Sequence, residues 1–314
     1  MSVRRMLRVT LGLALTATAV LTGTAQAGDR TTDTAAARAA AGEQLLHFNH
    51  AYAVVDRETA DAIEHSAYLP EFAHFEVRTT TGADLTWTGR YVIGRETYLE
   101  FFGEDDLPGQ DAESGASGLA VSTERAGDLA AVTQHLRDRG AAPVEGRQTR
   151  DFGDGVPVPW FDALFPSAEP YEAFSTWGME YLPEYFADPR SGTGPEAFPG
   201  DVGRYRYLPD DYRDHLLRDI TGVHLGVPAA DLAPLIPMLE AGGYTLHTLP
   251  GGGVTVDDGL TLIRLDPVPR EEAGLRTVHL SLNEAPGDRH VERIGNSTLT
   301  VGPADRAVWT FDAP

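Results

Sequence analysis

Three stretches of this sequence repeat one order of hydrophobic and polar positions. Each opens on a short apolar run, continues through an amphipathic stretch, and ends in several runs in which apolar and polar residues alternate. In the first, the run 47–55 precedes a stretch at 56–66 that Asp56 can cap, and in the third, apolar residues recur at i, i+3, i+4 and i+7 from Leu232. Alternation predicts half-buried strands, and the second spacing predicts helices. The pattern therefore predicts an α+β fold built from repeated βαβββ units.

The positions of these units divide the chain into parts. The first two units occupy residues 43–187 and are expected to form one domain. A stretch rich in glycine, proline, tyrosine and aspartate follows at 188–219, which is typical of a linker, and a short helix is expected at 208–219. Residues 220–314 are expected to form a third related α+β unit, and the sequence shows no later unit that would pair with it.

The amino terminus has the features of a signal peptide. A basic start with three arginines is followed by an apolar stretch over 9–25 and by a small-x-small motif that ends at Ala27. These features predict that residues 1–27 are removed and that the mature protein is secreted.

Composition excludes several partners and reaction classes. The chain carries 47 acidic residues against 25 basic ones, a formal charge of −22, and the signal peptide holds three of the arginines. Such a surplus opposes binding to nucleic acid and to anionic membranes. The chain contains no cysteine and no lysine. Disulfides, thiolate metal sites, Schiff-base chemistry and a Walker phosphate loop are therefore excluded.

Three segments carry a resemblance to a known family. The segment FNHAYAVVDRETADAI (48–63) is similar to an opening strand and helix of the vicinal oxygen chelate superfamily, which contains glyoxalase I, extradiol dioxygenases and bleomycin-resistance proteins. The segments TYLEFFGE (97–104) and FSTWGMEYL (174–182) are similar to closing strands of such units. The resemblance implies that the first two units pair to close a half-barrel.

The same resemblance implies a metal centre. Its ligands to a divalent first-row metal would be His50, Glu100 and Glu180, and their side chains should converge on one cavity. Where the second unit should repeat His50 the chain has Gly118, which should face the same cavity and leaves the usual four-ligand set incomplete. His224 restores the histidine pattern in the third unit.

The residue pattern also supports a pocket on physical grounds. His50 alternates with Tyr52 along one strand and Glu100 with Tyr98 along another, so each shares a strand face with an aromatic neighbour. An imidazole with two carboxylates suits Fe(II), Mn(II), Ni(II) or Zn(II). An alternative remains open, in which His50 is a hydrogen-bonded core histidine and Glu100 a carboxylate at the rim.

Two main functions follow from these features. One is a metal-dependent lyase or oxygenase that acts on an oxygen-rich small molecule. The other is a metal-free extracellular protein that binds or sequesters a small molecule in the same cavity. A scaffold without a ligand is a third possibility, because one fold can host many functions. The sequence specifies neither catalytic residues nor the ligand, nor the oligomeric state.

Overall fold

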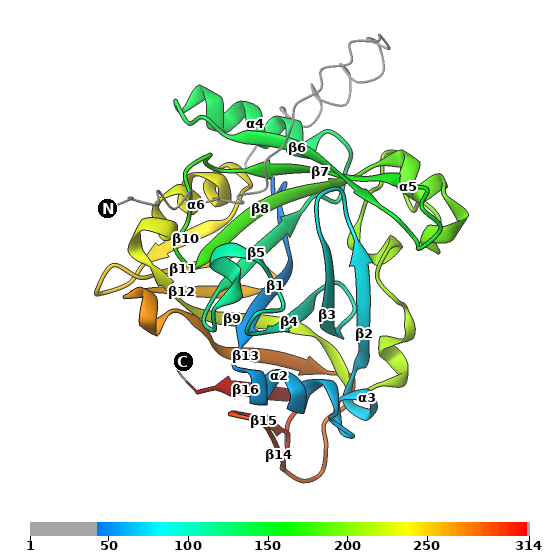
Figure 1. Cartoon of the computed structure of the whole chain (residues 1–314), viewed down its shortest axis with the longest axis vertical. Helices are drawn as coiled ribbons and strands as arrows, with labels where there is room; N and C mark the ends of the chain where they lie inside the picture. The colour runs from blue at the N-terminus through cyan, green and yellow to red at the C-terminus, as the bar shows by residue number, and fades with distance from the viewer. Residues whose placement is uncertain (1–42, 313–314) are drawn as a thin grey trace, which may run out of the picture.

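The computed structural model describes residues 43–312, which form two eight-stranded sheets (Figure 1). The predicted signal peptide lies outside the described residues. The strands of each sheet come in sets of four, and helices connect some of them, so the predicted α+β fold with repeated units is confirmed. No helix in residues 43–312 is both long enough and apolar enough to span a membrane.

The first sheet contains the two units predicted at 43–187. Its order is β2-β3-β4-β1-β5-β8-β7-β6, with β1 parallel to β4, β5 parallel to β8, and β1 antiparallel to β5. The two units therefore meet along β1 and β5, and a single bridge between Thr81 and Asp151 connects the two outer strands. The strands and helices are β1 (His47–Val55), α2 (Arg57–Glu64), α3 (Leu69–Phe72), β2 (His74–Thr81), β3 (Thr86–Ile93), β4 (Tyr98–Gly103), η1 (Gly109–Ala112), β5 (Ser117–Ser122), α4 (Asp128–Asp138), β6 (Val144–Arg150), β7 (Val158–Phe165) and β8 (Phe174–Tyr181).

The second sheet contains two sets of four strands where the sequence indicated one unit. Its order is β10-β11-β12-β9-β13-β16-β15-β14. The fourth set has no helix between its first two strands, which is why the helical spacing did not reveal it. Without the chain reversal that a helix provides, β16 returns antiparallel to β13, whereas β12 is parallel to β9. The elements are β9 (Leu217–Pro228), α6 (Ala229–Ala241), β10 (Thr245–Thr248), β11 (Val254–Asp257), β12 (Leu262–Val268), η5 (Arg270–Glu272), β13 (Gly274–Leu282), β14 (His290–Ile294), β15 (Ser297–Val301) and β16 (Arg306–Phe311).

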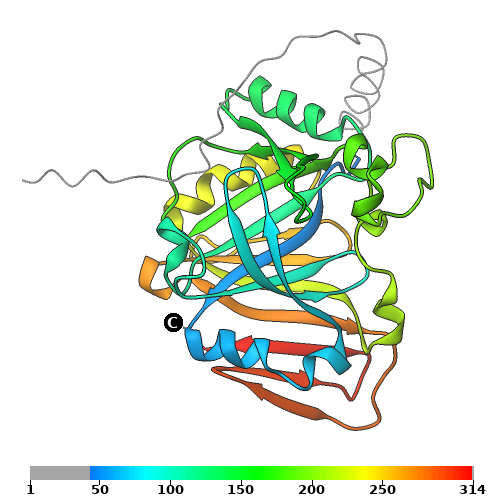
Figure 2. The same cartoon turned by 45° about the vertical axis from the view of Figure 1, so that its right-hand side comes forward.

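The largest hydrophobic core lies between the two sheets, which form layers in Figure 2. It joins Phe48 and Phe101 of the first sheet to Trp309 and Phe311 of the second, and the rings of Phe101 and Trp309 are 5.2 Å apart. One face of the first sheet is therefore buried against the second sheet. The opposite face, which we call the inner face, is the one available for a site.

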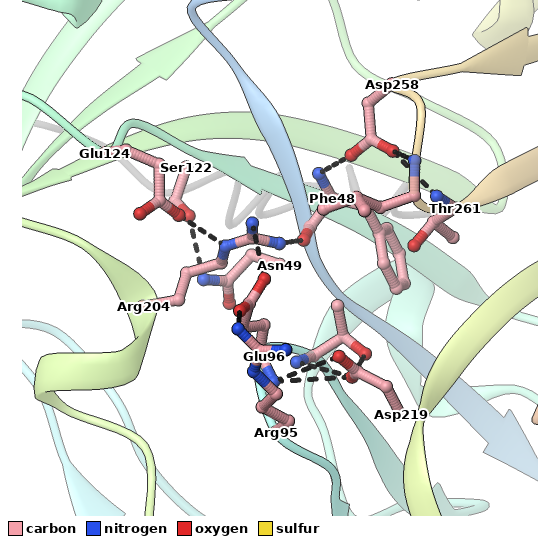
Figure 3. Close-up of polar contacts among 12 residues, drawn as sticks. Phe48, Asn49, Arg95, Glu96, Ser122, Glu124, Arg204, Asp219, Asp258 and Thr261 are labelled. Carbon is pink, nitrogen blue, oxygen red and sulfur yellow. Dashed lines mark hydrogen bonds and ion pairs between the residues drawn. The ribbon is translucent and has the colours of Figure 1, made fainter. Parts of the chain in front are cut away.

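Aspartates of the second sheet also bind backbone amides of the first. Asp258 accepts a hydrogen bond from Phe48 N at 2.9 Å (Figure 3). Asp219 accepts one from Thr97 N at 3.0 Å. Asp231 at the start of α6 accepts three more, from the amides of residues 172–174 at the entry to β8. The second sheet thus fixes the ends of strands that carry the inner face.

The segment predicted as a linker folds back onto the first sheet. After α5 (Pro183–Ala187), residues 188–216, which we call the strap, contain the short helices η2 (Pro189–Ser191), η3 (Arg204–Arg206) and η4 (Asp211–Asp214). Arg204 is buried and pairs with Glu124 at 2.6 Å (Figure 3). Tyr207 stacks on Tyr181 with ring centroids 3.7 Å apart. The strap is therefore an anchored part of the first domain.

Candidate functional site

His50 and Glu100 lie close together on the inner face. Their exposed fractions are 4% and 7%, and His50 Nε2 is 4.0 Å from Glu100 Oε2. Burial lowers the pKa of His50 to about 3 and raises the pKa of Glu100. The imidazole is therefore neutral at physiological pH, and the carboxyl binds its proton more tightly than an exposed glutamate would.

Hydrogen bonds fix which nitrogen of His50 carries the proton. The register between β1 and β5 skips Asn49, a bulge that lets its side chain reach the same region as His50. The Asn49 amide nitrogen donates to Ser122 Oγ at 3.0 Å and to Tyr207 Oη at 2.8 Å. Its oxygen is therefore the acceptor for His50 Nδ1–H, at 2.8 Å. Nε2 then presents a lone pair toward Glu100.

Glu100 presents a second acceptor to the same space. Its Oε1 accepts hydrogen bonds from Tyr91 Oη and from Trp87 Nε1, the latter at 2.9 Å. Oε2 remains directed toward His50 Nε2. Two buried acceptors that face each other are stabilised by a proton, a hydrogen-bond donor or a cation between them.

Gly118 also faces this region, and an aromatic ring occupies the place of its missing side chain. A Cβ atom at Gly118 would lie 2.1 Å from Cε1 of Tyr52, which is much closer than two carbon atoms that are not bonded can approach. Tyr52 is held there because its hydroxyl donates to Asp111 at 3.0 Å and is 3.1 Å from Ser175 Oγ. A tyrosine ring thus fills the space that a second histidine would need.

Strand register identifies the residue that corresponds to Glu100 in the second unit. Glu100 pairs with Tyr52 across the parallel strands β4 and β1, and Trp177 pairs with Ala120 across β8 and β5. Tyr52 and Ala120 each stand two residues after the matched positions His50 and Gly118. The residue that matches Glu100 is therefore Trp177, an indole rather than a carboxylate.

The predicted role of Glu180 requires correction, because its side chain is directed to the other face of the sheet. It stands three residues beyond Trp177, and an odd offset along a strand reverses the face. Its carboxylate accepts hydrogen bonds from Gly127 N at 2.8 Å, Leu129 N at 3.0 Å and Thr123 Oγ1 at 3.3 Å. Glu180 therefore binds the amino terminus of α4, where backbone amides need acceptors.

The side chains present do not fit the metal centre that the resemblance implies. Of the three predicted ligands, His50 and Glu100 are brought together and Glu180 is not. Within residues 43–312, no group of three or more histidine, cysteine, aspartate or glutamate side chains could hold a metal ion. The two remaining ligand positions of the half-barrel hold Gly118, covered by a ring, and Trp177.

Aromatic rings surround the facing acceptors. His50 stacks on Tyr98 with ring centroids 4.2 Å apart and forms a T-shaped pair with Trp177 at 5.5 Å between centroids. The ring centroids of Tyr52 and Trp177 are 6.1 Å apart. Alternation along the strands predicted Tyr52 and Tyr98 as neighbours of the site. Asn49 was missed, because the bulge that turns its side chain has no signature in the sequence.

The second sheet repeats one feature of the site in a more exposed form. His224 on β9 and Asp266 on β12 hold the places that His50 and Glu100 hold on the first sheet. Their side chains are 27% and 29% exposed and hydrogen-bonded to each other at 2.8 Å. This pair is already satisfied, so His224 serves as a matched reference for His50.

Comparison with known proteins places the chain in a family. A model for a family of unknown function (DUF5829) matches residues 48–311. This chain belongs to that family. None of the curated proteins matches it.

Solved structures share the fold at low sequence identity. A hypothetical protein from Staphylococcus aureus has a TM-score of 0.51 at 10% identity, over 82% of this chain and 98% of that chain. A Mn(II)-bound glyoxalase from Novosphingobium aromaticivorans has a TM-score of 0.40 at 10% identity, over 84% and 81%. The 2,3-dioxygenase LapB from Pseudomonas sp. KL28 has a TM-score of 0.42 at 11% identity, over 86% and 93%. At 10% identity, the likeness to the Staphylococcus aureus protein concerns the fold alone.

Proposed function

We propose that the inner face of the first sheet binds a small aromatic molecule that carries a hydroxyl group, and that it does so without a metal. The observation that carries this proposal is the 4.0 Å separation between His50 Nε2 and Glu100 Oε2, two buried acceptors within a wall of aromatic rings. A hydroxyl oxygen can lie about 2.8 Å from both atoms, which is an ordinary hydrogen-bond length.

The protonation states of the pair suit such a hydroxyl. The raised pKa of Glu100 favours its protonated form, which can donate to the ligand oxygen. The ligand hydroxyl can then donate to His50 Nε2, whose lone pair is free because Asn49 accepts from Nδ1. The rings of Tyr98 and Trp177, which pack on His50, give the site an aromatic environment that favours an aromatic ligand.

The test compares phenol with anisole, which has the same ring but no hydroxyl proton. Binding is measured by calorimetric titration and by quenching of tryptophan fluorescence. Phenol should bind about tenfold more tightly than anisole, the ratio that one hydrogen bond of about 1.4 kcal/mol provides. Glu100→Gln should remove this preference, because its amide would donate directly to His50. Equal affinities for phenol and anisole in the wild-type protein would refute the proposal.

Two controls separate this function from its alternatives. His50→Ala should abolish the preference for phenol, whereas His224→Ala, at the corresponding place on the second sheet, should keep it. The titration is repeated after treatment with EDTA and after addition of Mn(II) or Zn(II). Binding that disappears with EDTA and returns with the metal would support the metal-dependent alternative instead.

We also propose that the protein acts outside the cell. The support is the amino-terminal pattern, which ends in a small-x-small motif at Ala27. Expression of the full chain in a secreting bacterial host and intact-mass measurement of the protein in the medium should give a chain that starts at Gly28. A full-length product that remains with the cells would overturn this expectation.

A further inference from the structure

Arg78 brings a positive charge next to the proposed binding site. Its guanidinium lies over the ring of Tyr91, with Cζ 4.2 Å from the ring centroid. The hydroxyl of the same ring donates to Glu100. Arg78 thus contacts the face of the Tyr91 ring, and Glu100 contacts its hydroxyl. The guanidinium and the carboxyl are separated by one tyrosine side chain.

The hydrogen-bonding capacity of this guanidinium is only partly used. One terminal nitrogen donates to Glu76, and within residues 43–312 Nε has no hydrogen-bond partner although it is buried. A buried donor without an acceptor is costly, so it favours a state in which an acceptor is supplied. The side chain as a whole is 33% exposed, which leaves room for the guanidinium to turn on the Tyr91 ring.

The charge of Arg78 acts on the same groups that form the site. Burial raises the pKa of Glu100 and that of Tyr98, whose ring stacks on His50, and the charge of Arg78 opposes both effects. A ligand whose ring contacts the aromatic side chains of the site could therefore place an anionic group beside Arg78. The Nε edge of a guanidinium matches the two oxygens of a carboxylate.

We propose that the ligand is a hydroxyaryl carboxylate whose carboxylate binds Arg78 and whose hydroxyl lies between His50 and Glu100. This inference rests on the proposed function and adds the charge of the ligand to it. It predicts that a carboxylate on the ligand ring, opposite the hydroxyl, strengthens binding. Because acidic residues outnumber basic ones on the chain, an anionic ligand needs a local positive charge, and Arg78 provides it.

The experiment measures dissociation constants for phenol and for 4-hydroxybenzoate with the full mature chain. The wild-type protein should bind 4-hydroxybenzoate about tenfold more tightly than phenol, as expected for a charged hydrogen bond. Arg78→Gln should bring this ratio to about one, and Arg78→Lys should give an intermediate ratio. Arg150→Gln is the matched control, because that guanidinium lies over Trp160 and donates to Tyr185.

Each outcome decides between the two proposals. A wild-type protein that binds phenol but binds 4-hydroxybenzoate no better refutes the role of Arg78 and leaves the proposed function standing. A ratio that falls in Arg150→Gln and persists in Arg78→Gln also overturns it. If neither compound binds to protein whose melting temperature shows it to be folded, the proposed function fails together with this inference.

Discussion

Replacing His50 with glutamine should change how the stability of the chain depends on pH. The folded state holds His50 with a pKa of about 3, whereas the unfolded chain has the ordinary value of 6.5. Because the folded pKa is depressed, the contribution of His50 is fully present above pH 6.5 and is lost as pH falls toward 3. Between pH 7 and pH 5 the loss amounts to about 2 kcal/mol in the free energy of unfolding.

Other groups contribute to the same pH range, so a comparison of variants is needed. Burial lowers the pKa of His47 to about 4, which destabilises the fold in the same direction as pH falls. Glu100 has a raised pKa and acts in the opposite direction, since its contribution is lost as pH rises. The difference between wild type and His50→Gln isolates one histidine.

The assay is urea unfolding at pH 7 and at pH 5, followed by tryptophan fluorescence and by far-ultraviolet circular dichroism. Wild type should lose about 2 kcal/mol more than His50→Gln between these two pH values. His65→Gln, at an exposed position, should lose as much as wild type. Equal losses in wild type and His50→Gln would show that folding does not lower the pKa of His50. The folded protein would then hold a protonated imidazole at pH 5, which contradicts a free lone pair on Nε2.

Two further predictions test the correspondence between the units. Glu180→Ala should lower the free energy of unfolding by about 1–3 kcal/mol, because it removes the acceptor of Gly127 N and Leu129 N. The same variant should bind phenol as the wild type does. Loss of phenol binding in a variant that remains stable would contradict the structural role of Glu180. Gly118→His alone should prevent folding, because its Cβ would lie 2.1 Å from the Tyr52 ring, whereas the same change combined with Tyr52→Ala should restore folding and supply a third metal ligand. A rise in melting temperature with Zn(II) for the double variant only would verify the register, and its absence in a folded double variant would refute it.

Local patterns in the sequence predicted much of the first domain. Alternation predicted that His50 and Glu100 share strand faces with Tyr52 and Tyr98, and those side chains do lie on one face of the first sheet. The prediction for Glu180 was wrong because a closing strand shows its alternation but not its register against β5. A shift of three residues moves a side chain to the opposite face, and only the pairing of Trp177 with Ala120 fixed that register.

The sequence by itself determined the alternation of strands and helices, the excess of acid and the absence of cysteine and lysine, since each depends on residue types or on neighbours a few positions apart. Only the tertiary structure decided what the inner face can bind. Tyr52 fills the space above Gly118, Asn49 orients His50, and the strap brings Tyr207 to Asn49 across 158 residues of chain. These contacts join segments far apart in sequence, and their geometry depends on the bulge and on strand register, which no local pattern of hydrophobic and polar residues encodes.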